Sequence, residues 1–300
     1  SSKETPALQA GQKIHIFHKE AEAFLAYDSV LDIKLAGEGT THYQPRHNTT
    51  MGRSGKTTKN AVIPVDGSGM SVFLLCQKQS NTLWEIEPDP KSAGGNVQWK
   101  MKFRFRHVGS SKYLSCDARA SGSDQKKRDN IELVLTYDSS LPGTLFELHS
   151  IEPQATEEIL PDKLVRIRNT HTRFWLNGLQ EVADGSMRGE PNVWYRVVLS
   201  AAAGAADVFM LGSPLEKDVM DIHFSLGARS VLRRYIHNLE QEVQGNENID
   251  EVRRVLSELA IFCSKGTDES NPAIRTGKPV SRRQRMLVEQ GLLSALVSIS

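Results

Sequence analysis

One short motif occurs three times along the chain and limits the fold more than any other feature. In each copy a hydrophobic residue stands two positions before a His or Asn, an aromatic residue stands six after it, and a leucine stands seven after it. The copies are Ile16-Phe17-His18 with Phe24-Leu25, Phe105-Arg106-His107 with Tyr113-Leu114, and Ile167-Arg168-Asn169 with Trp175-Leu176. An internal repeat of this kind means that every copy forms the same supersecondary unit.

Each copy ends on a second shared element, an aromatic residue within a hydrophobic stretch. The three stretches are Leu83-Trp84-Glu85-Ile86, Leu145-Phe146-Glu147-Leu148 and Val208-Phe209-Met210-Leu211. The offset from the His or Asn to this aromatic is 39 residues in the second copy and 40 in the third, against 66 in the first. The first copy therefore carries an insertion of about 26 residues, which we expect in a long loop rich in Gly, Thr, Ser and Asn.

The repeat predicts strands. Each copy opens with residues that alternate between two faces, as in Lys13-Ile14-His15-Ile16, and a polar turn precedes the return strand. A unit of four short strands cannot bury its apolar face alone, but three units can close into a barrel without exposed edges. We predict a β-trefoil, with a three-bladed propeller as the alternative. The His or Asn is predicted to hydrogen-bond a turn rather than to bind a ligand.

After Leu211 the hydrophobic spacing becomes helical. The expected helix faces are Leu232, Ile236, Leu239 and Val243; then Val252, Val255, Leu256, Leu259 and Phe262; then, in a third helix from about Ser281, Met286, Leu293, Leu296 and Val297. The second helix is expected to end at Lys265-Gly266. Antiparallel helices with short loops favour an α-solenoid. We expect a disordered lead-in at 1–10, the trefoil at 11–212 and a truncated α-helical domain at 213–300.

Composition narrows the classes of function. The formal net charge of +1 gives no overall attraction to nucleic acid, and no apolar run is long enough to span a membrane. Cys76, Cys116 and Cys263 lack metal-ligand spacing and favour a reducing, cytosolic setting. The chain has no nucleophile elbow, no His-Glu-x-x-His and no Cys-x-x-Cys. We therefore expect no enzyme activity, no catalytic residues, no metal site and no cofactor.

A cationic cluster lies at the start of the third predicted helix. Arg275, Lys278, Arg282, Arg283 and Arg285 fall within eleven residues, with no acid between the first and the last. Arg282 and Arg285 are three residues apart and can share a helix face. The N-terminus of a helix also favours an anion through its dipole and its free amides. The cluster is either a phosphate-binding rim or a solvated basic face.

These features together resemble the ligand-binding core of the inositol 1,4,5-trisphosphate receptor family, over about Gly11 to Ser300. The repeats resemble MIR motifs, which also occur in protein O-mannosyltransferases, and the helices resemble an armadillo-like region. The most specific segments are Gly11–His18, Leu83–Glu87 and Arg283–Gln290. The resemblance implies a cleft between trefoil and helices that holds an inositol phosphate.

It also implies a wider setting. The core would belong to a tetrameric calcium-release channel on the cytosolic face of the endoplasmic reticulum membrane. Its partners would be other domains and subunits of that channel, with no nucleic acid. It would meet the membrane only through a C-terminal region beyond this chain.

Aligned with this family, the chain lacks most of the expected basic ligands. The family's basic positions fall on His15, Ala23, Ser281 and Val288, whereas Arg285 keeps a cation. The family's Arg-Thr-Thr-Gly-Arg loop falls on residues 36–40. The segment Thr49-Thr50-Met51-Gly52-Arg53 looks like a displaced copy of that loop, which the insertion could bring back to the cleft. The candidate anion-binding residues are Arg285, Arg282, Gly37, Gly39, Thr40, Arg53 and Lys278.

The missing cations predict weak binding. Each charge-assisted contact to a phosphate contributes about 1.5–3 kcal/mol. Losing four or five of them would erase a micromolar site. We expect inositol 1,4,5-trisphosphate, or another small polyanion, to bind weakly or not at all. Two alternatives remain open: a structural module of a hetero-oligomeric channel that binds no ligand, and an MIR accessory domain of a glycosyltransferase in a lumenal, glycosylated setting.

Overall fold

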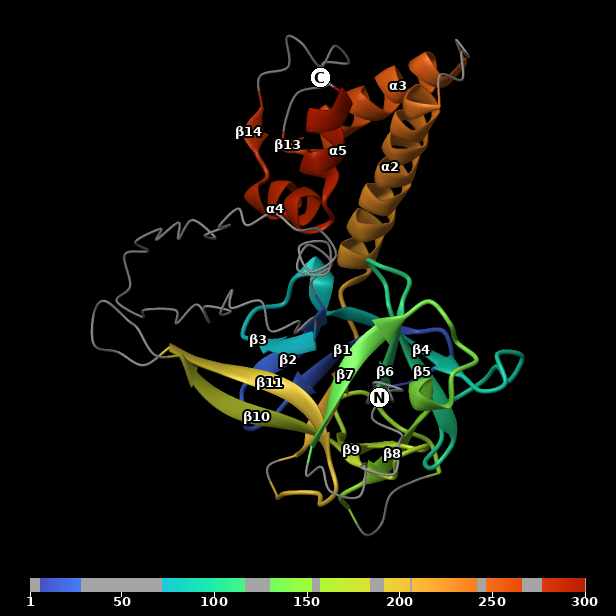
Figure 1. Cartoon of the computed structure of the whole chain (residues 1–300), viewed down its shortest axis with the longest axis vertical. Coiled ribbons are helices and arrows are strands. Elements are labelled where there is room, and N and C mark those ends of the chain that lie inside the picture. The colour runs from blue at the N-terminus through green and yellow to red at the C-terminus, as the bar shows by residue number, and fades with distance from the viewer. Residues whose placement is uncertain are drawn as a thin grey trace, which may run out of the picture. The chain divides into compact units, whose positions relative to one another are not determined.

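The computed structural model describes residues 6–27, 72–116, 130–152, 157–183, 192–205, 207–241, 247–265 and 277–299 (Figure 1). The chain forms two compact units. One comprises Ser1–Lys78 and Thr82–Ser213, and the other comprises Gln79–Asn81 and Pro214–Ser300. The described part of the first unit is built mainly from strands, and that of the second mainly from helices.

Each repeat supplies four strands to the first unit. The first repeat gives β1 (Lys13–His18), β2 (Ala23–Tyr27), β3 (Val72–Leu75) and β4 (Leu83–Pro88). The others give β5 (Lys102–His107), β6 (Tyr113–Cys116), β7 (Asn130–Thr136) and β8 (Phe146–Ser150), then β9 (Leu164–Asn169), β10 (Trp175–Ala183), β11 (Asn192–Ser200) and β12 (Phe209–Gly212). The strands predicted to open, return and close each copy are confirmed. The long loop predicted for the first copy, over 38–69, falls within residues 28–71, which lie outside the described residues.

Six of these strands form a closed ring. β1 pairs with β4, β4 with β5, β5 with β8, β8 with β9, β9 with β12 and β12 with β1, all antiparallel. The other six form three hairpins, β2–β3, β6–β7 and β10–β11. Because consecutive repeats pair with one another, the arrangement excludes separate propeller blades. It is a closed barrel compatible with the predicted β-trefoil.

The residues that define the repeat form the barrel core. The hydrophobic residue two before the His or Asn, the leucine seven after it and the closing aromatic are each 0–1% exposed in all three copies. These are Ile16, Phe105 and Ile167; Leu25, Leu114 and Leu176; and Trp84, Phe146 and Phe209. The motif is thus the sequence signature of a shared core, in which each copy buries its apolar face against the others.

The His or Asn of each copy organises the turn that follows its strand. Each side chain is buried and accepts the amide of the residue three further on. The bonds run from Ala21 to His18 Nδ1 at 3.0 Å, from Ser110 to His107 Nδ1 at 3.2 Å and from Thr172 to Asn169 Oδ1 at 3.0 Å. One residue later the backbone turns left-handed, with φ of 47° at Glu22, 61° at Ser111 and 66° at Arg173. The predicted structural role of this position is confirmed.

The second unit contains four described helices. They are α2 (Glu216–Glu240), α3 (Glu247–Phe262), α4 (Ser281–Glu289) and α5 (Leu292–Ile299). β13 (Ser264–Lys265) and β14 (Lys278–Pro279) form a short antiparallel ladder between α3 and α4. α2 packs against α3, α4 and α5. Ser80 also belongs to this unit and donates its amide and its hydroxyl to the Glu289 carboxylate, at 3.2 and 2.5 Å.

Several predicted details of the helices are wrong. The third helix is interrupted, because Gly291 adopts a φ of 69° and ends α4 as a left-handed C-terminal residue. α3 ends at Phe262, and Lys265 lies in β13. Four side chains predicted on buried faces are exposed instead: Leu239 by 53%, Leu256 by 36%, Leu293 by 50% and Val297 by 75%. The buried positions of the last two helices are Met286, Leu287, Leu292 and Ala295.

Candidate functional site

Three of the predicted anion ligands lie in the helical unit. Arg282 and Arg285 belong to α4, Lys278 belongs to β14, and all three are exposed. The other four candidates, and the neighbouring cation of the cluster, lie outside the described residues: Gly37, Gly39, Thr40, Arg53 and Arg275. The described part of the candidate site is therefore the basic start of α4 together with β14.

Arg283 is bound inside the helical unit. Its Nη2 and Nε donate to the two carboxylate oxygens of Asp221 on α2, at 2.9 and 3.2 Å. Its Nη1 donates to the Phe262 carbonyl at 3.1 Å, and its guanidinium lies 4.4 Å from the centroid of the Phe262 ring. The Asp221 side chain is only 8% exposed. This forked ion pair joins α4 to α2 and to the end of α3, so it occupies the donors that a phosphate would need.

Arg282 also meets an acid of α2. Its Nη2 forms an ion pair with Asp218, and the two side chains are 53% and 23% exposed. Asp218 and Asp221 are three residues apart on α2 and therefore share a face of that helix. The adjacent residues Arg282 and Arg283 of α4 each form an ion pair with one of these two acids. An anion bound by Arg282 would lie beside this carboxylate and be repelled by it. Neither acid is recognisable as a partner from the sequence, because the arginines lie more than sixty residues downstream. Their spacing on one helix face was the available signal.

Two features still favour an anion at the start of α4. The first turn contains no acidic residue, and Arg285 and Lys278 are exposed. Two backbone amides there are not available to an anion, because Arg283 and Gln284 donate theirs to the Val280 carbonyl, at 2.9 and 3.1 Å. The helix dipole contributes a partial positive charge at this end. The remaining cationic part of the candidate site is therefore small.

The two trefoil positions at which the resemblance implies basic ligands are buried. His15 is 4% exposed, and its Nδ1 lies 3.0 Å from the Thr82 carbonyl and 3.1 Å from Thr82 Oγ1. Because a carbonyl can only accept, that nitrogen carries the hydrogen. Ala23, on β2, is fully buried. Neither position presents an exposed cation.

Among the described residues, no group of three or more His, Cys, Asp or Glu side chains is arranged to hold a metal ion. In the same part of the chain, none of the helices has the length and apolar character needed to cross a membrane.

Comparison with known proteins places the β unit in a family. The sequence model of the MIR domain matches residues 7–211. The inositol 1,4,5-trisphosphate receptor itr-1 of Caenorhabditis elegans is 19% identical over 338 aligned residues, which cover 96% of this chain and 11% of the relative. The chain thus spans about a tenth of the length of this curated relative.

Two solved structures share part of the chain at low identity. One is an SDF2-like protein from Arabidopsis thaliana, with 16% identity and a TM-score of 0.44 over 70% of this chain and 99% of that one. The other is a Caenorhabditis elegans protein of unknown function, with 14% identity and a TM-score of 0.44 over 71% of this chain and 99% of that one.

Proposed function

Because the chain belongs to the MIR domain family, we propose that it is the ligand-binding core fragment of an intracellular calcium-release channel resembling inositol 1,4,5-trisphosphate receptors. One observation carries this proposal. The similarity to the Caenorhabditis elegans receptor covers 96% of the chain and therefore extends through the helical unit as well as the MIR domain. A glycosyltransferase accessory domain would account for the MIR domain alone.

The same similarity supports the setting that we propose for the fragment. The core is a non-catalytic module that works with further domains and subunits of the channel, on the cytosolic face of the endoplasmic reticulum membrane. The packing of α2 against α3, α4 and α5 supports an armadillo-like arrangement of the helices. The ligand is a small polyanion, and Arg285, Lys278 and the start of α4 are the described groups that would receive it.

Affinity for inositol 1,4,5-trisphosphate is weak or absent in this proposal. Arg283 is held by Asp221 and Arg282 by Asp218, so two of the arginines at the start of α4 already have internal partners. His15 and Ala23 add no exposed cation. Each phosphate contact is worth about 1.5–3 kcal/mol. Four missing contacts would cost about 6–12 kcal/mol if additive, enough to weaken a micromolar site beyond detection.

Calorimetric titration of the chain with inositol 1,4,5-trisphosphate, at low and at physiological salt, tests the proposal. We expect no saturable heat at micromolar ligand, and at most weak binding that salt abolishes. Saturable binding at low micromolar ligand would refute the weak-binding part and would direct attention to Arg53 and its loop.

A structural role without ligand is the second candidate function, and the internal ion pairs of Arg282 and Arg283 favour it. Absence of heat from any small polyanion at either salt would support that role. Binding of another polyanion, with none of the inositol phosphate, would favour a receptor core whose ligand has changed.

A further inference from the structure

The ring of six strands contains three seams, where the closing strand of one repeat pairs with the opening strand of the next. These seams are β4–β5, β8–β9 and β12–β1. Equivalent positions can therefore be compared within one molecule. The first set of facing pairs is Glu85 with Arg106, Glu147 with Arg168 and Met210 with Phe17; the second set is Glu87 with Arg104, His149 with Arg166 and Gly212 with His15.

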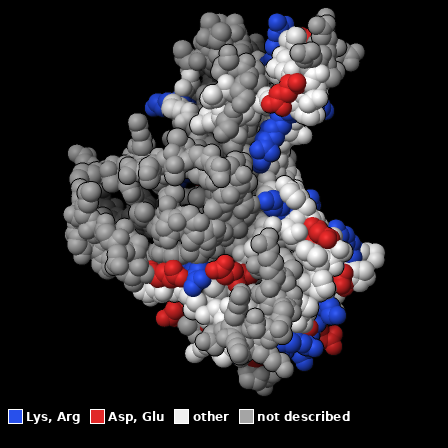
Figure 2. Space-filling model, in the orientation of Figure 1, with Lys and Arg blue, Asp and Glu red and all other residues white. Residues whose placement is uncertain are grey.

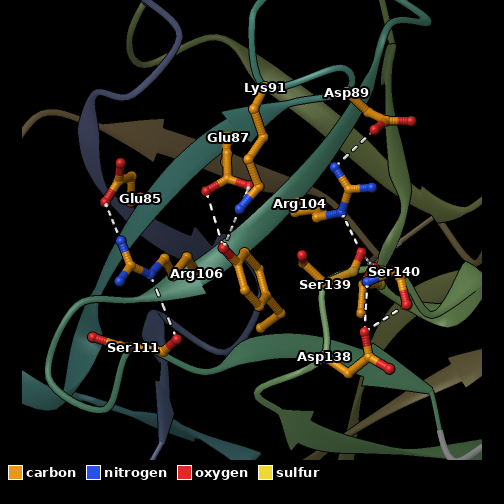
Figure 3. Close-up of polar contacts among 12 residues, drawn as sticks. Glu85, Glu87, Asp89, Lys91, Arg104, Arg106, Ser111, Asp138, Ser139 and Ser140 are labelled. Atoms are coloured by element: carbon orange, nitrogen blue, oxygen red, sulfur yellow. Dashed lines mark hydrogen bonds and ion pairs between the residues drawn. The ribbon is translucent and has the colours of Figure 1, made fainter.

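The β4–β5 seam pairs its arginines with its own acids (Figure 3). Arg104 Nη1 lies 2.8 Å from Asp89, and its Nε donates to the Ser139 carbonyl at 2.8 Å. Arg106 Nη1 lies 3.7 Å from Glu85. The acids come from β4 and the residue just after it, so both guanidinium groups find a carboxylate within the fold.

The β8–β9 seam has lost two of the three equivalent acids. His149 and Ile151 stand where the first seam has Glu87 and Asp89, and the Ile151 side chain is 37% exposed. Glu147 keeps its carboxylate but places it 3.1 Å from His149 Nε2. In the described part of the chain it forms no ion pair with the arginine that faces it across the seam.

Among the described residues, the two arginines of β9 keep donors without acceptors. They are two residues apart on one strand and so lie on the same face. Arg166 Nε is buried and has no partner among the described residues, and its Nη2 reaches only the Gly204 carbonyl at 3.4 Å. Asp207 contributes a favourable charge, but it accepts the Gly204 amide at 2.6 Å and lies beyond ion-pair distance of Arg166.

Arg168 is held in place while its outer nitrogens stay open. Its Nε donates to the Arg173 carbonyl at 3.0 Å, and its guanidinium lies over the Trp175 ring, 5.2 Å from the centroid. Nη1 and Nη2 have no acceptor within the described ranges. A guanidinium fixed in this way loses little freedom when a carboxylate binds both nitrogens.

Apolar surface lies beside these cations. Trp175 is half-buried, and His149 packs against its edge with the ring centroids 5.0 Å apart. Ile151, which stands where the first seam has Asp89, adds an exposed apolar side chain. Tryptophan and arginine are the residues most enriched in the energetic centres of protein interfaces.

We propose that the β8–β9 seam binds an acidic segment of a partner protein. Carboxylates of that segment take the roles that Glu85 and Asp89 have in the β4–β5 seam, one at Arg168 and one at Arg166, and its apolar side chains cover Trp175 and Ile151. The face seen in Figure 2 shows basic and acidic side chains interspersed over the described residues, with no broad patch of one sign. The proposed attraction rests on the open donors of Arg166 and Arg168.

Fluorescence anisotropy tests this with a labelled peptide of alternating glutamate and leucine, and with the same peptide carrying glutamine instead of glutamate. We expect the chain to bind the glutamate peptide in a saturable, salt-sensitive way and at least tenfold more tightly than the glutamine peptide. Equal binding of the two peptides, or no saturable binding of either, would overturn the proposal.

Three variants locate the contact. Arg168→Gln should weaken binding of the glutamate peptide by about tenfold or more. Ile151→Asp restores an internal acid for Arg166, so it should weaken binding without lowering the melting temperature. Arg106→Gln is the matched control in the β4–β5 seam and should leave binding unchanged. Equal loss in Arg106→Gln and Arg168→Gln, or wild-type binding by Ile151→Asp, would contradict the assignment.

Discussion

Removal of the Arg283 charge should destabilise the helical unit strongly. Arg283→Met keeps the length of the side chain but removes two hydrogen bonds to Asp221, one to the Phe262 carbonyl and the contact with the Phe262 ring. Asp221 is left with an uncompensated charge on a side chain that is 8% exposed. Breaking a buried ion pair from one side costs about 3–5 kcal/mol. We expect a loss of that size in the free energy of unfolding.

The chain offers a clean assay for this variant. All four tryptophans, Trp84, Trp99, Trp175 and Trp194, precede residue 214, so tryptophan fluorescence reports on the β unit. Far-ultraviolet circular dichroism follows the helices. In urea, Arg283→Met should lower the midpoint of the circular dichroism transition and leave the fluorescence transition nearly in place.

The neighbouring Arg282→Gln is the control. Its ion pair with Asp218 has side chains 53% and 23% exposed. Pairs of this kind contribute about 0–1 kcal/mol. The double variant Arg283→Met with Asp221→Leu should recover much of the loss, because it removes the stranded charge. If Arg283→Met costs no more than Arg282→Gln, the reasoning that ties the three helices together through Arg283 is wrong.

Two further changes probe the β unit. Burial lowers the pKa of His18, partly offset by Glu20, so the unfolded chain takes up a proton first as the pH falls. The free energy of unfolding should fall as the pH drops below about 6.5, the pKa of the histidine in the unfolded chain, and should level off below the folded pKa. His18→Asn should remove this pH dependence from urea unfolding curves. At Gly143 an added Cβ would lie 2.6 Å from Cys116 Sγ. Gly143→Ala should therefore cost about 1–3 kcal/mol in urea unfolding. The control is Gly227→Ala on α2 of the helical unit, where nothing lies within 4 Å of the added Cβ, and it should be neutral or stabilising.

The barrel could be predicted from the sequence because the repeat consists of its core residues. Trp84 and Phe146 are fully buried at equivalent places, and the same holds for Leu25 and Leu114. The exchange of His for Asn at position 169 indicated a turn, since both side chains accept an amide there. When a repeated motif consists of core residues, the spacing of its copies predicts the repeating strands of the fold.

The helices and the site were harder to predict, for reasons of tertiary structure. Leu293 and Val297 satisfy a helical spacing, but Gly291 interrupts the helix and changes which face is buried. Arg282 and Arg283 are adjacent and look alike in sequence. They differ in their partners on α2, because Arg282 forms an exposed ion pair with Asp218 and Arg283 forms a more buried one with Asp221. Long-range partners of this kind leave no local pattern.

In the function proposed above, Asp218 and Asp221 occupy two of the arginines at the start of α4 and thereby weaken the binding of inositol phosphates. Titration of the wild-type chain and of Asp218→Asn with inositol 1,4,5-trisphosphate, side by side at low salt, tests it most directly. We predict no saturable binding at micromolar ligand for the wild type, and affinity about fivefold higher for the variant, because roughly 1 kcal/mol of repulsion is removed. Low-micromolar binding by the wild type, or no gain in Asp218→Asn where weak binding is measurable, would contradict the claim.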